Sequence, residues 1–396
     1  MIPKAQLLAL AKHYELQPTT VQKDYVVGWL LRAISEHAVL SQWVFKGGTC
    51  LKKCYFETYR FSEDLDFTIP LEQSVSVDYI KTPIDEAVSW IESNSGLSFP
   101  RQYWKVEEYE KLRGKTSFQM KLPFSGPLGL PSKSLQRVKF DLTQDELIED
   151  TPQLRNLHHD YTDVSNPPPQ ILCYSINEVL AEKTRALVER NGRARDVYDV
   201  VNISRNFRVE INPQRTKDIA NKKFQFKGLK TPSVEYIMDS IDNSVLRANW
   251  EHQLAHQINK LPPVDIFIDD LRDAIAWWLK PEIAKPSLQP MPQASGEIVP
   301  RSLFPKINWQ TGPTAMYQVR YAARNKLCAL ISYHRSTRLV EPYSMRYPST
   351  GNEILHVWEL EKNGMPSDMH KSFKTHEIDS ASISNHTFIP KWEVEL

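Results

Sequence analysis

A pair of glycines that precedes two alternating aspartates constrains the fold of this chain more than any other feature of its sequence. The segment KGGTCLKKCYFETYRFSEDLDF occupies residues 46–67. Gly47 and Gly48 break a short predicted strand, and a second strand that carries Asp64 and Asp66 follows a predicted helical turn. This order of strand, turn, helix and strand predicts an α+β fold with a ligand site at the turn.

The glycine turn has the composition of a phosphate-binding loop. Glycines let the backbone approach a phosphate closely and keep side-chain bulk out of the turn. Thr49 follows near the start of a predicted helix, where amide groups and the helix dipole favour an anion. A glycine turn alone is a weak signal, so the functional argument depends on the aspartates that follow it.

Asp64 and Asp66 are expected on one face of their strand, with Leu65 and Phe67 on the buried face. Two carboxylates so close repel each other and favour a divalent cation. Nucleotidyl transfer uses such a site, because metal ions neutralise the triphosphate and lower the pKa of the attacking hydroxyl. The alternative interpretation is a glycine turn followed by a solvated acidic strand.

These motifs resemble a known family. Gly47-Gly48-Thr49 followed by Asp64-Leu65-Asp66 is similar to the AbiEii nucleotidyltransferase toxins of abortive-infection and toxin–antitoxin systems, which include the MenT toxins. The resemblance covers roughly residues 1–280. It implies a DNA polymerase beta-like nucleotidyltransferase core followed by a helical bundle, with Mg²⁺ or Mn²⁺ as cofactor and an NTP as substrate.

The resemblance also implies a third carboxylate on a neighbouring strand. In the string RVKFDL, Arg137, Lys139 and Asp141 alternate with apolar residues. Asp141 is therefore the candidate, and a solvated strand end is the alternative. The expected metal ligands are Asp64, Asp66 and Asp141, and with Lys183 they form the expected catalytic set.

Lys183 lies within the apolar stripe of a predicted helix that begins with a capping box at Ser175 and Glu178. A lysine on a buried stripe is costly unless an anion meets it. The resemblance implies that this lysine helps to bind the triphosphate and that Asp196 supports it; a snorkelling lysine and a surface ion pair are the alternatives. The expected nucleotide-binding residues are Lys46, Gly47, Gly48, Thr49, Ser62, Lys183, Arg195 and Asp196.

A basic segment with interleaved phenylalanines follows between residues 205 and 230. This composition suits a phosphate backbone with unstacked bases, although a solvated face over a phenylalanine core is an equal alternative. The expected RNA-binding residues are Arg205, Arg208, Arg215, Lys217, Lys222 and Lys223. The resemblance implies tRNA, or another RNA, as the acceptor.

The chain of 396 residues is long enough for several domains. We expect a catalytic domain over 1–170, a helical domain that completes the site over 171–280, and a proline-rich linker over 281–300. Over roughly residues 317–380, the segments EILHVWEL and KSFKTHEIDSASI weakly resemble the WYL domain, a small Sm-like β-barrel, so we expect a WYL-like domain over 301–396. Within them, the pattern predicts one helix from about Met316 to Ser332.

Composition adds few constraints. A net charge of +1 indicates no global attraction to nucleic acid. Cys50 and Cys54 have no second Cys/His pair at zinc spacing, so we interpret them as reduced helix residues. The chain shows no signal-peptide pattern and no apolar run of the ~18 residues that span a membrane, which predicts a cytoplasmic protein without membrane association.

The sequence therefore predicts a toxin-type nucleotidyltransferase that moves a nucleoside monophosphate from an NTP to a hydroxyl, with the tRNA 3′ end as the expected acceptor. A toxin–antitoxin or phage-defence role implies a cognate antitoxin, expected to be a winged-helix protein. One alternative is a catalytically silent regulator that senses nucleic acid through the C-terminal domain. Another is an enzyme of the same fold that acts on a protein or a small molecule. Retention of all three carboxylates and Lys183 favours the active enzyme.

Overall fold

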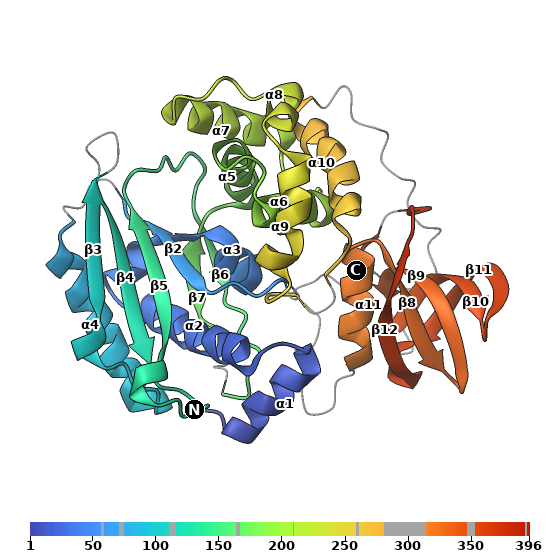
Figure 1. Ribbon diagram of the computed structural model, residues 1–396, viewed down its shortest axis with the longest axis horizontal. Helices are drawn as coiled ribbons and strands as arrows, with labels where there is room; N and C mark the ends of the chain where they lie inside the picture. The colour runs from blue at the N-terminus through green and yellow to red at the C-terminus, as the bar shows by residue number, and fades with distance from the viewer. Residues whose placement is uncertain are drawn as a thin grey trace. The chain divides into compact units, whose positions relative to one another are not determined.

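The computed structural model divides into two compact units (Figure 1). One unit comprises residues 1–200 and 209–261, and the other comprises residues 201–208 and 262–396. The described residues are 1–56, 59–70, 75–110, 116–163, 167–208, 210–258, 261–280, 314–346, 353–392 and 394–396. The predicted linker, residues 281–300, lies outside the described residues, and the predicted domain boundaries stay predictions.

A seven-stranded mixed sheet forms the centre of the first unit. Its strands are β1 (Val44–Lys46), β2 (Asp64–Thr68), β3 (Lys105–Glu110), β4 (Thr116–Phe124), β5 (Gln136–Thr143), β6 (Gln153–Asn156) and β7 (Gln170–Cys173). They lie in the order β3-β4-β5-β2-β1-β7-β6. β2 runs parallel to β5 and antiparallel to β1, so the middle of the sheet unites the segments that carry the predicted motifs.

The alternation in β2 and β5 divides their side chains between two faces. Leu65, Phe67 and Phe140 are fully buried. Asp64 and Asp66 are half-buried on the opposite face. The period-2 pattern of the sequence therefore predicted both strands and the face that each aspartate occupies.

Helices surround this sheet. The N-terminal helices are α1 (Lys4–Tyr14), α2 (Pro18–Glu36), α3 (Gly47–Cys50), which continues as a π-helical turn over Leu51–Tyr55, and α4 (Val77–Ser95). α2 packs against β5, β7 and α4. Its apolar stripe, which includes Val21, Tyr25 and Trp29, is buried. The helical turn that was predicted after the glycine pair is confirmed by α3 and the π-helical turn.

A helical segment follows the sheet in the sequence. It contains α5 (Ile176–Glu189), α6 (Ala194–Asn206), α7 (Pro213–Phe226), α8 (Val234–Asp239) and α9 (Asn243–Leu254). The Ser175 hydroxyl accepts the Glu178 N–H at 3.1 Å, as the capping signature predicted. Gly192 separates α5 from α6 with a φ of +74°, and a Cβ there would lie 2.6 Å from Ile241 Cγ2. Only glycine fits this break.

The second unit contains α10 (Val264–Leu279), α11 (Thr314–Arg324) and a five-stranded antiparallel sheet. Its strands are β8 (Leu327–Tyr333), β9 (Ser336–Arg346), β10 (Ile354–Lys362), β11 (Met365–Lys374) and β12 (Ile378–Thr387), in the order β11-β10-β9-β8-β12. Tyr343 and Trp392 stack in its core, where Cys328 is also buried. The WYL-like and barrel-like character of this unit stays a prediction.

One predicted helix is wrong in its second half. We expected a helix from Met316 to Ser332, but α11 ends at Arg324 and β8 begins at Leu327. Lys326 adopts a left-handed φ of +53°, which ends the helix. β8 then pairs with the adjacent strand β9 and with the distant strand β12. These pairings assign to a strand an apolar run that periodicity alone could not assign.

Strands β3, β6 and β7 were not predicted. β6 and β7 are only four residues each, and their flanking segments give no clear alternation. Among the described residues, no helix combines the length and the apolar character that crossing a membrane requires.

Candidate active site

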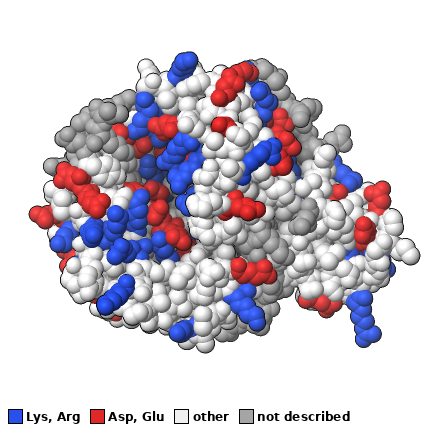
Figure 2. All heavy atoms as spheres, viewed as in Figure 1, with Lys and Arg blue, Asp and Glu red and all other residues white. Residues whose placement is uncertain are grey.

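A cavity of about 460 Å³ lies beside the centre of the sheet in the first unit. Its sheet wall comes from strands β1 to β5 with the glycine turn, and its helical wall comes from α5 and the start of α6. Figure 2 shows Lys and Arg side chains next to Asp and Glu side chains around a hollow in this face, over β5 and β2. The cavity is therefore strongly charged and carries both signs.

Strand register brings the predicted carboxylates together. Asp66 is paired with Asp141 across the parallel β2–β5 ladder. On its other side, Asp66 is paired with Lys46 of β1. Asp64 lies two residues away on the same face, and all four side chains line the cavity. The structure therefore unites the three aspartates that the sequence singled out, from strands far apart in the chain.

The carboxylates on the sheet wall are incompletely neutralised. Loss of water contact and the negative charges of Asp141 and Asp64 raise the pKa of Asp66 to about 6, although Lys46 acts in the opposite direction. Lys139 contacts Asp141 directly, with Nζ 2.6 Å from Oδ2. Three clustered carboxylates with a deficit of positive charge fit a hard divalent cation, which prefers oxygen ligands.

The glycine turn leaves space for this cluster. Gly47 has a φ of +81°, and a Cβ at this position would lie 2.3 Å from Asp66 Oδ2. A Cβ on Gly48 would lie 2.5 Å from Arg60 Nη2. Both positions therefore exclude a side chain, the first through its backbone conformation as well as its neighbour.

Thr49 and Ser62 connect the turn to β2. The Thr49 hydroxyl lies 2.9 Å from Ser62 Oγ and also donates to the backbone carbonyl of Asp64. Thr49 is fully buried, whereas Ser62 lines the cavity. Of these two predicted nucleotide-binding residues, Ser62 faces the cavity and Thr49 holds the turn in place from behind.

A compact ion cluster forms the helical wall. Lys183 Nζ lies 2.8 Å from Asp199 and 3.1 Å from Asp196. Arg60 binds both carboxylate oxygens of Asp199 at 2.8 Å. Although burial opposes it, the charges of Arg60 and Lys183 hold the pKa of Asp199 well below its usual range. Arg195 also lines the cavity, and its guanidinium donates to the Gln253 carbonyl.

A second ion cluster holds Lys46. Its Nζ lies 3.2 Å from Glu182 and 3.9 Å from Glu146. Glu146 also pairs with Arg185 at 2.9 Å. Burial opposes ionisation of Glu146, but the charges of Lys46 and Arg185 lower its pKa strongly. Lys46 therefore links this cluster to the aspartates of the sheet wall.

The predicted RNA-binding residues do not form one continuous set. Arg205 and Arg208 belong to the second unit and the other residues to the first. Arg205 pairs with Asp270 at 2.8 Å, and Arg208 lies over the Trp277 ring. Lys223 is fully buried and pairs with Glu178 at 2.6 Å, so its side chain offers no surface to a nucleic acid.

The remaining residues of that set lie on α7. Arg215 pairs with Asp150 at 3.3 Å, Lys222 pairs with Glu149 at 2.5 Å, and Lys217 is half-buried. A basic composition did not reveal these acidic partners, because they lie more than sixty residues away in the chain. An RNA surface formed by this set stays a prediction.

Several cavity residues were missed in the sequence. They are Arg60, Tyr109, Gln119, Lys139, Glu146, Glu182 and Arg185. Arg60 stands directly before the predicted strand, and Glu182 precedes Lys183, but neither position carries a local signal of burial. Asp199 was not among the predicted site residues, although it is the centre of the helical ion cluster.

Comparisons with known proteins give a family match and a similar solved structure. A model of the family described as "Nucleotidyl transferase AbiEii toxin, Type IV TA system" matches residues 29–280, a range that includes every residue lining the cavity. Among solved structures, the chain is similar to MenT4, a nucleotidyltransferase toxin from Mycobacterium tuberculosis H37Rv. That match has a TM-score of 0.44 and 17% identity, and covers 71% of this chain and 90% of MenT4. No curated protein matches the chain.

Proposed function

This chain belongs to the AbiEii family of nucleotidyltransferase toxins of type IV toxin–antitoxin systems, and from that premise we propose that it transfers a nucleoside monophosphate from an NTP to the 3′ end of a tRNA. In this reaction the acceptor hydroxyl oxygen forms a bond to the α-phosphorus. The bond from that phosphorus to the β-phosphate oxygen breaks, and pyrophosphate leaves. The hydroxyl proton passes to solvent.

One observation supports the proposal above all others. Asp64, Asp66 and Asp141 face one cavity, and burial together with the negative charges of Asp141 and Asp64 raises the pKa of Asp66 to about 6. Mg²⁺ or Mn²⁺ held by these three carboxylates would neutralise the triphosphate and lower the pKa of the acceptor hydroxyl. A purely structural role would not explain why repelling charges are kept together beside an open cavity.

The residues around the carboxylates would bind and orient the nucleotide. The backbone of Gly47 and Gly48 can approach a phosphate closely, because neither residue has a side chain. Lys183 and Arg195 present positive charge from the helical wall, where Asp196 and Asp199 fix the Lys183 amino group. Binding to fixed donors would hold the triphosphate in line with the acceptor, which is the main contribution of the protein to phosphoryl chemistry.

A toxin of this family has a cognate antitoxin, and we propose a winged-helix protein for that role. The silent-regulator alternative predicts that the cavity binds no NTP productively. The two hypotheses separate on one measurement, because a silent scaffold would leave every acceptor unlabelled.

The test is a labelling reaction. Purified protein is incubated with each α-labelled NTP, Mg²⁺ and total RNA, and the products are separated by size. We expect one NTP to label the tRNA band, and we expect no label with Asp66→Asn protein. Label on another RNA would correct the acceptor but keep the transferase. Absence of label on RNA, protein and small molecules with all four NTPs would favour the silent scaffold.

A further inference from the structure

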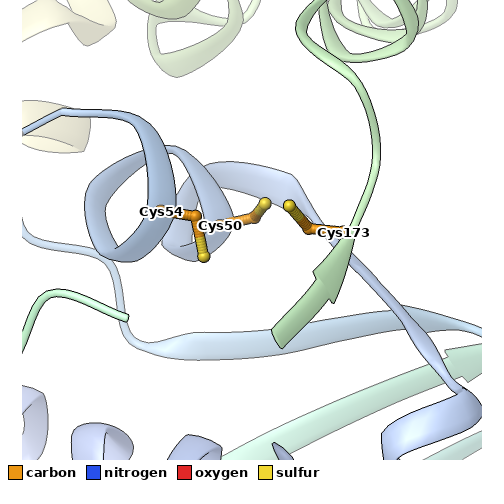
Figure 3. Close-up of side chains that lie close together, drawn as sticks. All are labelled: Cys50, Cys54 and Cys173. Atoms are coloured by element: carbon orange, nitrogen blue, oxygen red, sulfur yellow. The ribbon is translucent and has the colours of Figure 1, made fainter. Parts of the chain in front are cut away.

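Three buried cysteines meet close to the glycine turn, although one of them is far from the others in sequence. The sulfur atoms of Cys50, Cys54 and Cys173 all lie within 4.8 Å of one another. All three are free thiols. Figure 3 shows Cys50 and Cys54 on one helical segment and Cys173 at the end of β7, with the sulfurs of Cys50 and Cys173 pointing toward one another. We call these three residues the thiol cluster.

The fold places the thiol cluster firmly. Cys50 ends α3, and Cys54 lies in the π-helical turn that follows, so both belong to one helical segment. Cys173 is the last residue of β7 and is paired with Phe45 of β1. The exposed fractions of the three cysteines are 0%, 4% and 0%. The sulfurs are thus preorganised in a site closed to solvent.

The spacing of the sulfurs fits a metal ion. An ion bonded to sulfur at ~2.3 Å holds its thiolate ligands about 4 Å apart. The sulfurs of the thiol cluster, within 4.8 Å of one another, need only small side-chain rotations to reach that spacing. A disulfide would bring two sulfurs to ~2.05 Å and leave the third unused. Thiolates select soft ions and disfavour Mg²⁺.

We propose that Cys50, Cys54 and Cys173 bind a thiophilic metal ion, Zn²⁺ or Cu⁺. Each coordinating thiol gives up its proton to solvent when its bond to the ion forms. This site is separate from the carboxylates that line the cavity, and it needs no assumption about the transferase reaction.

Groups near the thiol cluster suit such an ion. The Tyr55 hydroxyl lies 4.0 Å from Cys173 Sγ, and the Arg155 guanidinium stacks over the Tyr55 ring at 4.2 Å. This arginine offsets part of the negative charge of the thiolates. The Gln153 carbonyl oxygen lies 3.4 Å from Cys173 Sγ and is a candidate fourth ligand for Zn²⁺, which takes four. Cu⁺ would use the sulfurs alone.

A bound ion would stabilise the glycine turn. Cys50 directly follows Thr49, the residue that connects the turn to β2 through its hydroxyl. An ion shared with Cys173 would attach this segment to β7. The metal would therefore act as a structural clamp behind the turn, without contact to the reacting groups.

The first test measures metal content and needs no variant. Full-length protein is purified under reducing conditions, loaded in separate samples with Zn²⁺ or Cu⁺, and desalted for elemental analysis. We expect about one equivalent of one of these ions per chain and a raised melting temperature. Co²⁺ loading should give sulfur-to-cobalt charge-transfer absorption. The zinc and copper samples identify which ion the site prefers.

The second test uses variants. Cys50→Ser, Cys54→Ser and Cys173→Ser should each lose the bound ion and the cobalt absorption. Cys328→Ser is the matched control, because Cys328 is also buried but lies in the second unit. Less than about a tenth of an equivalent of both ions in wild-type protein would overturn the proposal. So would equal metal content in Cys173→Ser and wild-type protein. If a variant does not fold, the metal content and the cobalt spectrum of the wild-type protein still test the proposal.

Discussion

Buried charge is arranged in opposite ways on the sheet wall and on the helical wall of the cavity. On the sheet wall, burial and the repulsion of Asp141 and Asp64 raise the pKa of Asp66 to about 6. On the helical wall, Arg60 and Lys183 hold the pKa of Asp199 well below its usual range. One wall therefore keeps negative charge in excess, and the other neutralises it with close ion pairs.

This difference separates two kinds of charged residue. A buried carboxylate between two cations contributes to stability as long as both partners remain, and its removal is strongly destabilising. A carboxylate held against other carboxylates costs stability and is retained where a ligand compensates it. Charge on the sheet wall should therefore matter for the reaction, and charge on the helical wall should matter first for the fold.

The largest effect is expected at Asp66. Asp66→Asn should lower transfer on the order of 10³-fold, because it removes a ligand of the catalytic cation. The folded protein should be at least as stable as wild type, because the substitution removes repulsion with Asp141 and Asp64. Steady-state labelling and thermal melting measure the two effects. The matched control is Glu107→Gln, an exposed carboxylate on β3 of the same sheet. Near-normal activity of Asp66→Asn would remove Asp66 from the metal site.

Asp199 should give the reverse result. Asp199→Asn keeps the shape of the side chain but leaves Arg60 and Lys183 buried without their shared counter-charge. We expect a loss of about 3–5 kcal/mol in the free energy of unfolding. Chemical denaturation measures this, with Asp239→Asn at the exposed end of α8 as the control. Equal denaturation midpoints for the two variants would contradict the conclusion that charge on the helical wall stabilises the fold.

Local sequence patterns predicted the aspartates of the sheet wall, because each of them lies in a short segment with the alternation of a strand. Asp64, Asp66 and Asp141 each alternate with apolar residues, so strand, face and site followed from period-2 reasoning. The helical wall depends on pairs far apart in the chain. Arg60 contacts Asp199, which lies 139 residues away in the sequence, and neither local sequence predicts that contact.

The same limit explains the other differences. Cys50 and Cys54 were interpreted as helix residues without a metal partner, because Cys173 reaches them only through the pairing of β7 with β1. Lys223 was expected on a basic surface, but Glu178 neutralises it inside the protein. Composition and spacing describe one segment at a time, whereas burial and ion pairing are decided between segments.

Lys183 tests a residue that belongs to the helical wall and also faces the cavity. The sequence alone predicts that Lys183→Ala would keep or raise stability, because a lysine on an apolar stripe is held there for function. The structure reverses the sign, since Asp196 and Asp199 would each lose one of their cationic partners. We expect Lys183→Met to weaken NTP affinity by roughly tenfold and to lower stability by about 1–3 kcal/mol. Nucleotide titration and denaturation measure both changes.

Two outcomes would contradict this dual role. Unchanged NTP affinity with lowered stability would make Lys183 purely structural. Lowered affinity with raised stability would show that the ion pairs with Asp196 and Asp199 contribute nothing net to the fold. Lys139→Met is a useful comparison, because Lys139 lines the same cavity from the sheet wall and pairs with Asp141.

The smallest effect is expected at Ser62, which faces the cavity but also takes part in a structural hydrogen bond. Its hydroxyl faces the cavity two residues before Asp64, yet it is already engaged by the Thr49 hydroxyl at 2.9 Å. Thr49 keeps its bond to the Asp64 carbonyl when Ser62 is replaced, so Ser62→Ala removes one hydrogen bond and leaves the other in place. A single neutral hydrogen bond contributes about 0.5–1.5 kcal/mol, which limits the loss in kcat/KM to roughly two- to tenfold. Steady-state kinetics at saturating Mg²⁺ measures it. A loss as large as that of Asp66→Asn would mean that Ser62 contacts the phosphate or the cation itself. Ser62 would then belong with the aspartates of the sheet wall as a residue that acts in the reaction.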